Sequence, residues 1–469
     1  MTALMIQGCT SWAGKSLITT ALCRWFARQG LQVAPFKAQN MSNNARVVDG
    51  GEIGAAQWLQ ARAAGVEPDV RMNPVLLKPE AGGSQVVLLG RYHPELSSRA
   101  WPDRSERLWP AVESALTELL SSYDLVMIEG AGSPAEINLA ANDIVNMRVA
   151  ARAQAPVLLA VDIDRGGAFA HLYGTWSLVA EQHRHLIRGF ILNRFRGDAA
   201  LLPPGPEQLE RLTGVPTVGV VPMIVHDLPD EDGAALHAPH RGGRPPVAIV
   251  RYPSASNLDE FTLLEQVADV RWATRPWHLN GAAMVVLPGS KHVAADLAWL
   301  QRNGLADAVR ATAGAGTRVL GICGGLQLLG TRLTDPNGVD GSGDGLGLLP
   351  LATTFQAAKT VRRRAVALPA GWPAPWEPLG GREVRGYEIR HGRSVVDGSV
   401  DVALDDALVV ARGNVAGWYL HGLLEEPGLL QALFGGGPAR TLDETFDLLA
   451  DAVDTHLDIA FLRQLTGVA

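Results

Sequence analysis

A glycine-bordered loop near the start of the chain has the residue types needed to hold phosphate groups. It spans residues 8–16 (GCTSWAGKS), between an apolar run and an amphipathic segment. In such a loop the backbone N–H groups point at phosphate oxygens, a lysine reaches the outer phosphates and a serine hydroxyl can bind Mg²⁺. We predict ATP binding here, against the alternative of a plain structural turn, through Gly8, Thr10, Gly14, Lys15 and Ser16.

Acidic side chains further along the chain could hold a magnesium ion beside this loop. Glu129 ends the apolar run 125–128, and a carboxylate at the tip of a strand is well placed to bind Mg²⁺. Asp49, with Glu52 close behind it, is a second candidate. We therefore expect Mg²⁺ as a cofactor with Ser16, Asp49 and Glu129 as ligands, although a helix-capping role would also explain Glu129.

Two further polar residues end predicted strands and could contact ATP. Lys37 could touch a phosphate, although a solvated lysine is nearly as common at such a position, and the amide of Asn193 could read the edge of adenine. Five residues separate Gly8 from Gly14, one more than in the common form of the loop. This spacing resembles the dethiobiotin synthetase group of phosphate-loop proteins, which activate carboxyl-type substrates.

The second reactive segment surrounds Cys323. Residues 318–330 (RVLGICGGLQLLG) read as a strand, a sharp turn at the cysteine and a helix. Glycines permit the strained backbone of such a turn, and a helix N-terminus favours the thiolate. A lone cysteine is more often structural, but this segment resembles the nucleophile elbow of class I glutamine amidotransferases. The resemblance implies Cys323 as the nucleophile, Gly324 beside the oxyanion and Gln327 in glutamine binding.

A thiolate mechanism also needs a base. His421 follows Cys323 by about 100 residues, in the chain order of that class. Many class I members carry a glutamate two residues beyond the histidine, but this position is Leu423 here. The third member of the triad is therefore absent or supplied from elsewhere, with Glu425 and Glu426 as candidates.

Two more segments resemble the glutamine site of the same class. Residues 287–291 (LPGSK) place Gly289 at the position of the oxyanion loop. Residues 385–392 (RGYEIRHG) look like the loop that holds the α-amino and carboxylate groups of glutamine, which implies Tyr387 and Glu388 as ligands. His391, taken alone, is more often a structural histidine.

The elements that must position these groups form two α/β patterns. Buried apolar runs that alternate with helices predict a parallel sheet covered on both faces. The first pattern has helix-like segments such as 16–29 and 53–64 between predicted strands at 4–8, 32–37, 125–129, 156–163, 189–193 and 217–221. The second has predicted strands at 247–252, 283–287 and 318–322, followed by β-like runs near 361–368, 384–390 and 416–420.

Changes in composition indicate the domain boundaries. Residues 226–246 are rich in Asp, Gly, Pro and His and have no clear period, which is typical of a linker. We therefore predict four parts: an ATP-dependent phosphate-loop domain at 1–228, a linker at 229–245, a class I-type glutamine amidotransferase domain at 246–436, and a helical segment at 437–469.

The overall composition excludes several classes of protein. With 469 residues, 47% hydrophobic and 19% charged, the chain fits a globular protein of two or three domains and not a disordered one. A net charge of −7 without a dense Lys/Arg run argues against a nucleic-acid partner. Three cysteines, no apolar stretch long enough to span a membrane and no signal peptide predict a reducing, cytoplasmic location without a membrane partner.

Taken together, the motifs resemble the cobyric acid synthase family of cobalamin biosynthesis over nearly the whole chain. The most specific stretches are 36–44 (FKAQNMSNN), 49–54 (DGGEIG), 129–139 (EGAGSPAEINL) and 162–167 (DIDRGG). Ala38 departs from the family, which usually has proline there. The resemblance implies glutamine and a corrinoid as partners, and leaves the oligomeric state open. Asn40, Asn43, Asn44 and Asn138 become candidate corrin contacts.

The family's reaction is the amidation of carboxylates b, d, e and g of adenosylcobyrinic acid a,c-diamide, with one ATP and one glutamine used for each amide. One alternative is cobyrinic acid a,c-diamide synthase, which acts on an earlier corrin; the stretches 39–44 and 136–139 separate the two families. Another is a nucleotide-dependent regulatory module with an inactive glutaminase-like domain. The intact pair of Cys323 and His421 speaks against that second alternative.

Overall fold

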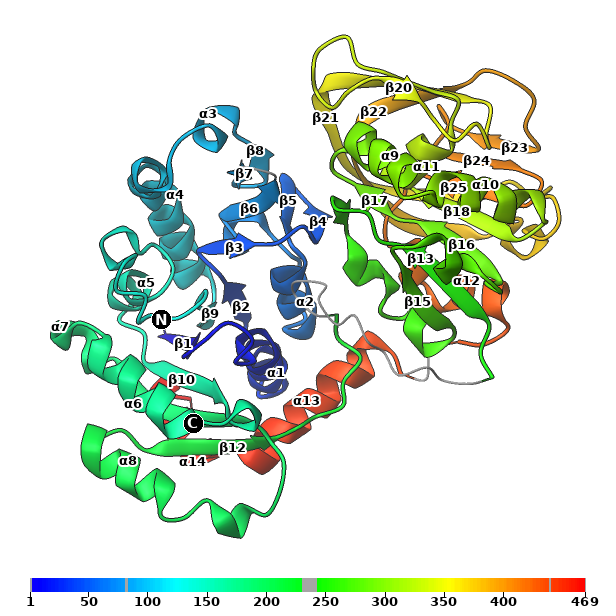
Figure 1. Ribbon diagram of the computed structural model, residues 1–469. Coiled ribbons are helices and arrows are strands. Elements are labelled where there is room, and N and C mark those ends of the chain that lie inside the picture. Colours follow the sequence, from blue (N-terminus) through cyan, green and yellow to red (C-terminus); the bar gives the residue numbers. More distant parts are fainter. Residues whose placement is uncertain (1, 81–82, 230–242, 438–439, 469) are drawn as a thin grey trace. The chain divides into compact units, whose positions relative to one another are not determined.

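The chain divides into two compact units in the computed structural model, which describes residues 2–80, 83–229, 243–437 and 440–468. The first unit comprises Met1–Asp227 together with Thr441–Ala469, and the second comprises Leu228–Arg440 (Figure 1). The predicted helical segment at the C-terminus thus packs with the first unit. Most of the predicted linker, residues 230–242, lies outside the described residues.

A six-stranded parallel sheet forms the centre of the first unit. Its strand order is β12-β11-β10-β1-β9-β2, and every neighbouring pair is parallel. The strands are almost uniformly apolar because helices cover both faces, as the sequence predicts. Their bounds are β1 Thr2–Gly8, β2 Val33–Phe36, β9 Leu125–Glu129, β10 Val157–Asp162, β11 Ile187–Phe195 and β12 Thr217–Pro222.

The first unit has ten α-helices among its described residues. They are α1 Lys15–Arg28, α2 Ala55–Ala63, α3 Pro94–Ser97, α4 Trp101–Ser122, α5 Met147–Ala153, α6 Ala168–Leu178, α7 Glu181–Arg184, α8 Gly205–Thr213, α13 Leu442–His456 and α14 Ile459–Thr466. Short strands between β2 and α4 make two small sheets that the sequence analysis did not predict: β3 Gln39–Met41, β4 Ala45–Val48, β5 Gly51–Gly54, β6 Val75–Glu80, β7 Gly83–Leu88 and β8 Arg91–Tyr92.

Helix α13 packs against α1, the helix that follows the phosphate loop (Figure 1). The Nε of Arg24 lies 2.8 Å from Asp447, and the indole N–H of Trp25 donates to Asp454 at 2.6 Å. A capping box at Thr441 and Glu444 starts α13. These side-chain contacts explain why the end of the chain completes the first unit.

The second unit is built on a mixed seven-stranded sheet of order β15-β13-β16-β18-β25-β24-β23. Five strands are parallel, and β24 and β23 continue the sheet antiparallel. The bounds are β13 Pro246–Val250, β15 Asp269–Ala273, β16 Met284–Leu287, β18 Arg318–Ile322, β23 Val402–Leu404, β24 Val409–Arg412 and β25 Val415–Trp418. The three predicted parallel strands are confirmed.

Smaller elements surround this sheet. The β-like runs near 361–368 and 384–390 belong to one long antiparallel hairpin of β21 and β22. The remaining elements are β14 Ala255–Ser256, β17 Gly289–Ser290, β19 Arg332–Thr334, β20 Gly343–Asp344, β21 Leu351–Ala367, β22 Glu383–Val396, α9 Val293–Arg302, α10 Leu305–Gly314, α11 Gly324–Leu329 and α12 Pro427–Phe434. Within the described ranges, no helix combines the length and apolar character needed to cross a membrane.

Candidate active sites in the two units

The phosphate loop joins β1 to α1 in the first unit. Gly14 has φ 92°, in the left-handed region that favours glycine, and a Cβ on it would lie only 2.0 Å from the amide nitrogen of Asn193. Lys15 is buried, and its ammonium donates to the main-chain oxygens of Thr10 at 3.4 Å and Gly132 at 3.3 Å. The ammonium therefore lies against the loop, where the phosphates of a nucleotide could meet it.

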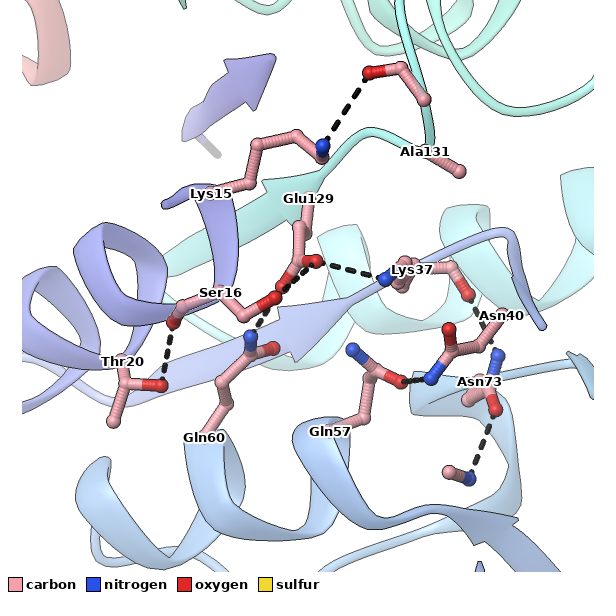
Figure 2. A network of polar contacts seen from close by, with 12 residues as sticks. Lys15, Ser16, Thr20, Lys37, Asn40, Gln57, Gln60, Asn73, Glu129 and Ala131 are labelled. Carbon is pink, nitrogen blue, oxygen red and sulfur yellow. Dashed lines mark hydrogen bonds and ion pairs between the residues drawn. The ribbon is translucent and has the colours of Figure 1, made fainter. Parts of the chain in front are cut away.

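Glu129, at the end of β9, is the centre of a polar network next to this loop (Figure 2). The carboxylate is fully buried and receives three donors: the hydroxyl of Ser16 at 2.8 Å, the ammonium of Lys37 at 2.8 Å and the amide of Gln60 at 2.5 Å. A buried carboxylate is tolerated only when such partners replace its lost hydration. The structure thus brings together three of the predicted residues.

Ser16 and Glu129 have the chemistry to hold Mg²⁺. Both offer oxygen atoms, and Mg²⁺ usually needs only one or two protein ligands because waters and phosphate oxygens supply the rest. No group of three or more His, Cys, Asp or Glu side chains in the described ranges is arranged for a metal. Asp49 lies exposed after β4 and is not one of the three residues that donate to Glu129, so its role as a ligand stays a prediction.

Asn193 lies beneath the phosphate loop. It is fully buried at the end of β11, and its amide donates to the main-chain oxygen of Ala13 at 2.9 Å. This contact supports the loop from below, whereas reading of adenine by the same amide remains a prediction. At the other end of the loop, a Cβ on Gly8 would lie 2.9 Å from the oxygen of Thr10, so glycine permits the tight path of the backbone.

Loss of the Lys37 ammonium should destabilise the first unit strongly. Lys37→Met would leave the carboxylate of Glu129 buried with two neutral donors, and breaking a buried ion pair from one side typically costs about 3–5 kcal/mol. The free energy of unfolding, measured in urea by intrinsic fluorescence, checks this. The matched control is Arg152→Met, which removes a half-exposed pair with Glu113 and should cost at most about 1 kcal/mol. Equal losses would contradict the prediction.

Cys323 forms a strained elbow between β18 and α11 in the second unit. Its φ of 52° and ψ of −106° are unusual for a residue with a side chain, and such strain is typical of reactive sites. A Cβ on Gly324 would lie 2.6 Å from the nitrogen of Ser290, and one on Gly325 would lie 1.8 Å from the oxygen of Leu287. Both positions therefore need glycine to bring the elbow against the loop that contains Gly289.

His421 lies beside the elbow and is held by a carboxylate. Its Nδ1 lies 3.0 Å from Oε1 of Glu260, and the N–H of Gly422 donates to the other oxygen at 3.0 Å. Both side chains are buried. Glu260 belongs to the short 3-10 turn Leu258–Phe261, which follows β14. The sequence suggests Glu425 or Glu426 for this place, but the structure instead puts Glu260 there.

The charges around His421 favour its protonated form. Burial alone would lower the pKa of the imidazole, but the charges of Glu260 and Cys323 and hydrogen bonds with both outweigh burial and raise the pKa to about 10. The thiol of Cys323 also contacts the main-chain oxygen of Ile389 at 3.4 Å. An imidazolium beside a cysteine stabilises the thiolate, which is the nucleophilic form.

Removal of the Glu260 charge should slow glutamine hydrolysis and move its pH profile. Glu260→Gln withdraws the anion that stabilises the imidazolium, so the pKa of His421 should fall and the alkaline limit of activity should move to lower pH. The rate should fall by roughly 10²–10⁴-fold, as when a histidine loses its orienting carboxylate. Glutamate release measured against pH tests this.

Glu425→Gln is the control for that measurement and should retain the wild-type profile. Glu425 lies in the turn Leu423–Glu425, after the histidine, where the sequence suggested the missing carboxylate. A Glu425→Gln profile that moves while the Glu260→Gln profile does not would reverse the assignment.

The loop after β16 supplies backbone groups next to the cysteine and histidine. Gly289 and Ser290 form β17, which pairs antiparallel with β14. A Cβ on Gly289 would lie 3.0 Å from Cε1 of His421, so this glycine lies directly against the imidazole. Backbone N–H groups at such a position could stabilise an oxyanion, as the resemblance implies.

The other predicted glutamine ligands have identified neighbours. The ring of Tyr387 stacks on His421 with centroids 5.4 Å apart, and its hydroxyl accepts a hydrogen bond from Asn257 at 3.2 Å. Gln327 donates to the hydroxyl of Tyr419 at 3.2 Å. Glu388 is fully buried and pairs with Arg362 and Arg390 at 2.6 and 2.7 Å. Direct contact of these side chains with glutamine stays a prediction.

Comparisons with known proteins identify a domain family for each part of the chain. Residues 4–232 match the CobQ/CobB/MinD/ParA nucleotide binding domain, and residues 246–428 match the CobB/CobQ-like glutamine amidotransferase domain. A protein of Variovorax paradoxus named cobyric acid synthase is 56% identical over 98% of both chains. Proteins of the same name from Polaromonas naphthalenivorans and Paracidovorax citrulli are 55% and 56% identical, over 99% and 98% of this chain and 99% and 97% of theirs.

The chain belongs to the cobyric acid synthase family. It is therefore an enzyme, a ligase of the amidotransferase type. Membership in the cobyric acid synthase family confirms the resemblance drawn from the motifs, including the order of the phosphate-loop and amidotransferase domains.

Two residues of the sites, Glu260 and Gln60, are not predicted from the sequence of this member of the cobyric acid synthase family. Glu260 lies 161 residues before His421, in a segment without a motif of its own, so spacing could not have connected them. Gln60 lies on α2, three residues after Gln57, and both are fully buried. The sequence shows only that two glutamines three residues apart share one face of the predicted helix 53–64. Their burial, which requires polar partners, is known from the structure.

Proposed function

We propose that the chain converts side-chain carboxylates b, d, e and g of adenosylcobyrinic acid a,c-diamide into amides, using ATP and the amide nitrogen of glutamine. The single observation that carries this proposal is the buried pair of Glu260 and His421 beside the strained Cys323. An inactive glutaminase-like domain would not need a carboxylate on Nδ1 or a strained residue at the elbow, and both features cost stability.

The first part of the reaction activates the acceptor. A carboxylate oxygen is a poor leaving group, so the acceptor carboxylate attacks the γ-phosphorus of ATP, giving an acyl phosphate and ADP. Lys15 stabilises the negative charge on the transferring group, and the loop N–H groups orient the phosphates. Mg²⁺ held by Ser16 and Glu129 would supply further charge neutralisation. Lys37 donates to the Glu129 carboxylate and orients it.

The second part releases ammonia. The thiolate of Cys323 attacks the side-chain amide carbon of glutamine, and His421 gives its proton to the departing nitrogen. Ammonia leaves, and a thioester remains on the sulfur. His421, now neutral, takes a proton from water, and the resulting hydroxide attacks the thioester carbon. The C–S bond breaks, which releases glutamate and restores the Cys323 thiolate and the His421 imidazolium. Ammonia then attacks the acyl phosphate, and phosphate leaves as the amide forms.

Mass spectrometry of the product tests this function. The protein would be incubated with ATP, Mg²⁺, glutamine and either adenosylcobyrinic acid a,c-diamide or cobyrinic acid, and the new amides on each corrin counted. Four new amides are expected on adenosylcobyrinic acid a,c-diamide. If only cobyrinic acid gained amides, the chain would be an a,c-diamide synthase. Neither substrate gaining an amide would favour a regulatory module.

The three cysteines are free in the structure. This state fits the cytoplasmic location that we propose for the enzyme, because cytosolic thiols are kept reduced.

A further inference from the structure

Asp296 connects two loops of the second unit that approach the cysteine. It lies in the first turns of α9, is 2% exposed and accepts hydrogen bonds from three groups. The hydroxyls of Ser254 and Ser290 donate to Oδ2 at 2.5 and 2.6 Å, and the N–H of Ser254 donates to Oδ1 at 3.2 Å. One buried carboxylate thus fixes residues 36 positions apart in the chain.

Each of these loops supplies part of the glutaminase site. Ser254 immediately precedes β14, which leads into the turn with Glu260. Ser290 belongs to β17, next to Gly289, and its backbone nitrogen lies against the elbow at Gly324. A small displacement of either loop would therefore move the carboxylate behind His421 or the N–H groups beside Cys323.

Few backbone hydrogen bonds hold these loops together: besides the pairing of β14 with β17, the N–H of Lys291 donates to the main-chain oxygen of Ser254 at 3.1 Å. Strands β14 and β17 pair over only two residues each, and a two-stranded ribbon of ordinary length is already marginally stable by itself. Side-chain contacts must supply the rest. Besides Asp296, the hydroxyl of buried Tyr252 donates to the main-chain oxygen of Pro288 just before β17.

We infer that Asp296 is a positioning residue for glutamine hydrolysis, which holds the oxyanion strand β17 and the Glu260 loop in register around Cys323. Asp296 does not touch the reacting atoms; it acts through Ser254 and Ser290. The inference rests on the proposed function, because it assigns a role within the same cysteine site. Misplacement of a catalytic group by about 1 Å can cost on the order of 10²-fold in rate.

The chain offers a matched control on the same helix. Asp340 accepts the N–H groups of Val293 and Ala294 at 2.9 and 3.0 Å and so caps the start of α9. Asp296 is buried and Asp340 is half-buried, and burial raises the pKa of both carboxyls. Asp340→Asn weakens the anchoring of α9 without removing the carboxylate that joins the two loops, whereas Asp296→Asn replaces an acceptor of that junction with a donor.

The experiment compares Asp296→Asn, Asp340→Asn and Cys323→Ala as full-length proteins. It measures kcat and KM for glutamine hydrolysis, amidation with ammonium, and alkylation of Cys323 by iodoacetamide. For Asp296→Asn we expect kcat to fall about 10²-fold with a much smaller change in KM. Ammonium-dependent amidation should stay at the wild-type level, since it needs neither loop. Alkylation of Cys323 should slow, because displacement of the Glu260 loop weakens the imidazolium that stabilises the thiolate. Asp340→Asn should match the wild type in all assays.

Two results would overturn the inference: wild-type kcat in Asp296→Asn, or an equal loss in Asp340→Asn. If Cys323→Ala retained glutamine hydrolysis, the proposed function itself would fail, which separates the two claims. If Asp296→Asn does not fold, Ser254→Ala tests the inference instead, because it removes one hydrogen bond to Asp296. Ser254→Ala should lower kcat by less than the roughly 10²-fold expected for Asp296→Asn, again with little change in KM. Unchanged kcat in Ser254→Ala would then contradict the inference.

Discussion

Cys323→Ala is expected to abolish glutamine-dependent amidation while ammonium-dependent amidation continues. Without the sulfur no thioester can form, so hydrolysis of glutamine should fall by at least about 10⁴-fold. Lys15, Ser16 and Glu129 lie in the first unit and are unchanged in this variant, so activation of the acceptor should be unaffected. Product amides are measured with glutamine or with ammonium chloride as the nitrogen source.

Cys23→Ala is the control for the loss of a thiol. Cys23 is fully buried on α1, and burial raises the pKa of its thiol far above the usual range, so it stays protonated and unreactive. This variant should use both nitrogen sources at nearly the wild-type rate. If ammonium failed to rescue Cys323→Ala, the division of the reaction between two sites would be wrong.

Lys15→Ala is expected to lose amidation with both nitrogen sources. The ammonium that lies against the loop would no longer stabilise the transferring phosphoryl group, and removal of one such group typically costs about 10²–10³-fold in rate. No acceptor is activated, so the source of nitrogen becomes irrelevant. Amides formed with glutamine and with ammonium are counted separately.

Thermal unfolding provides the control for this variant. Without nucleotide, Lys15→Ala should unfold close to the wild-type temperature, whereas the stabilisation that ATP gives the wild type should be reduced. If Lys15→Ala lost amidation with glutamine but kept it with ammonium, the phosphate loop would not be the site of acceptor activation.

The main sheets of both units could be predicted because their strands are buried on both faces. Such strands are continuous apolar runs, for example Leu125–Glu129 and Arg318–Ile322, and their boundaries agree with the structure. The small sheet around Gln39–Met41 was not predicted, since its strands are short and partly polar. Its pairing depends on tertiary contacts rather than on a local pattern.

The site residues also divide into those that a local motif predicts and those that only the fold brings together. Lys15, Ser16 and Cys323 were predictable because their chemistry depends on neighbours within one loop, which the sequence displays directly. Glu260 and Gln60 act on residues distant in the chain, so only the fold brings them to His421 and Glu129. The close contacts of Asn193 with Ala13 and Gly14 likewise follow from how β11 lies beside the loop, and the sequence showed only a polar residue at a strand end.

The most direct test of the central claim follows the nitrogen atom. The wild-type protein and Cys323→Ala would each be incubated with ATP, Mg²⁺ and adenosylcobyrinic acid a,c-diamide. Both reactions would contain glutamine labelled with ¹⁵N in the side-chain amide and an equal concentration of unlabelled ammonium chloride. The product would be analysed by mass spectrometry. We expect ¹⁵N in the new amides of the wild type and only ¹⁴N in those formed by Cys323→Ala. Labelled amides from Cys323→Ala would contradict it.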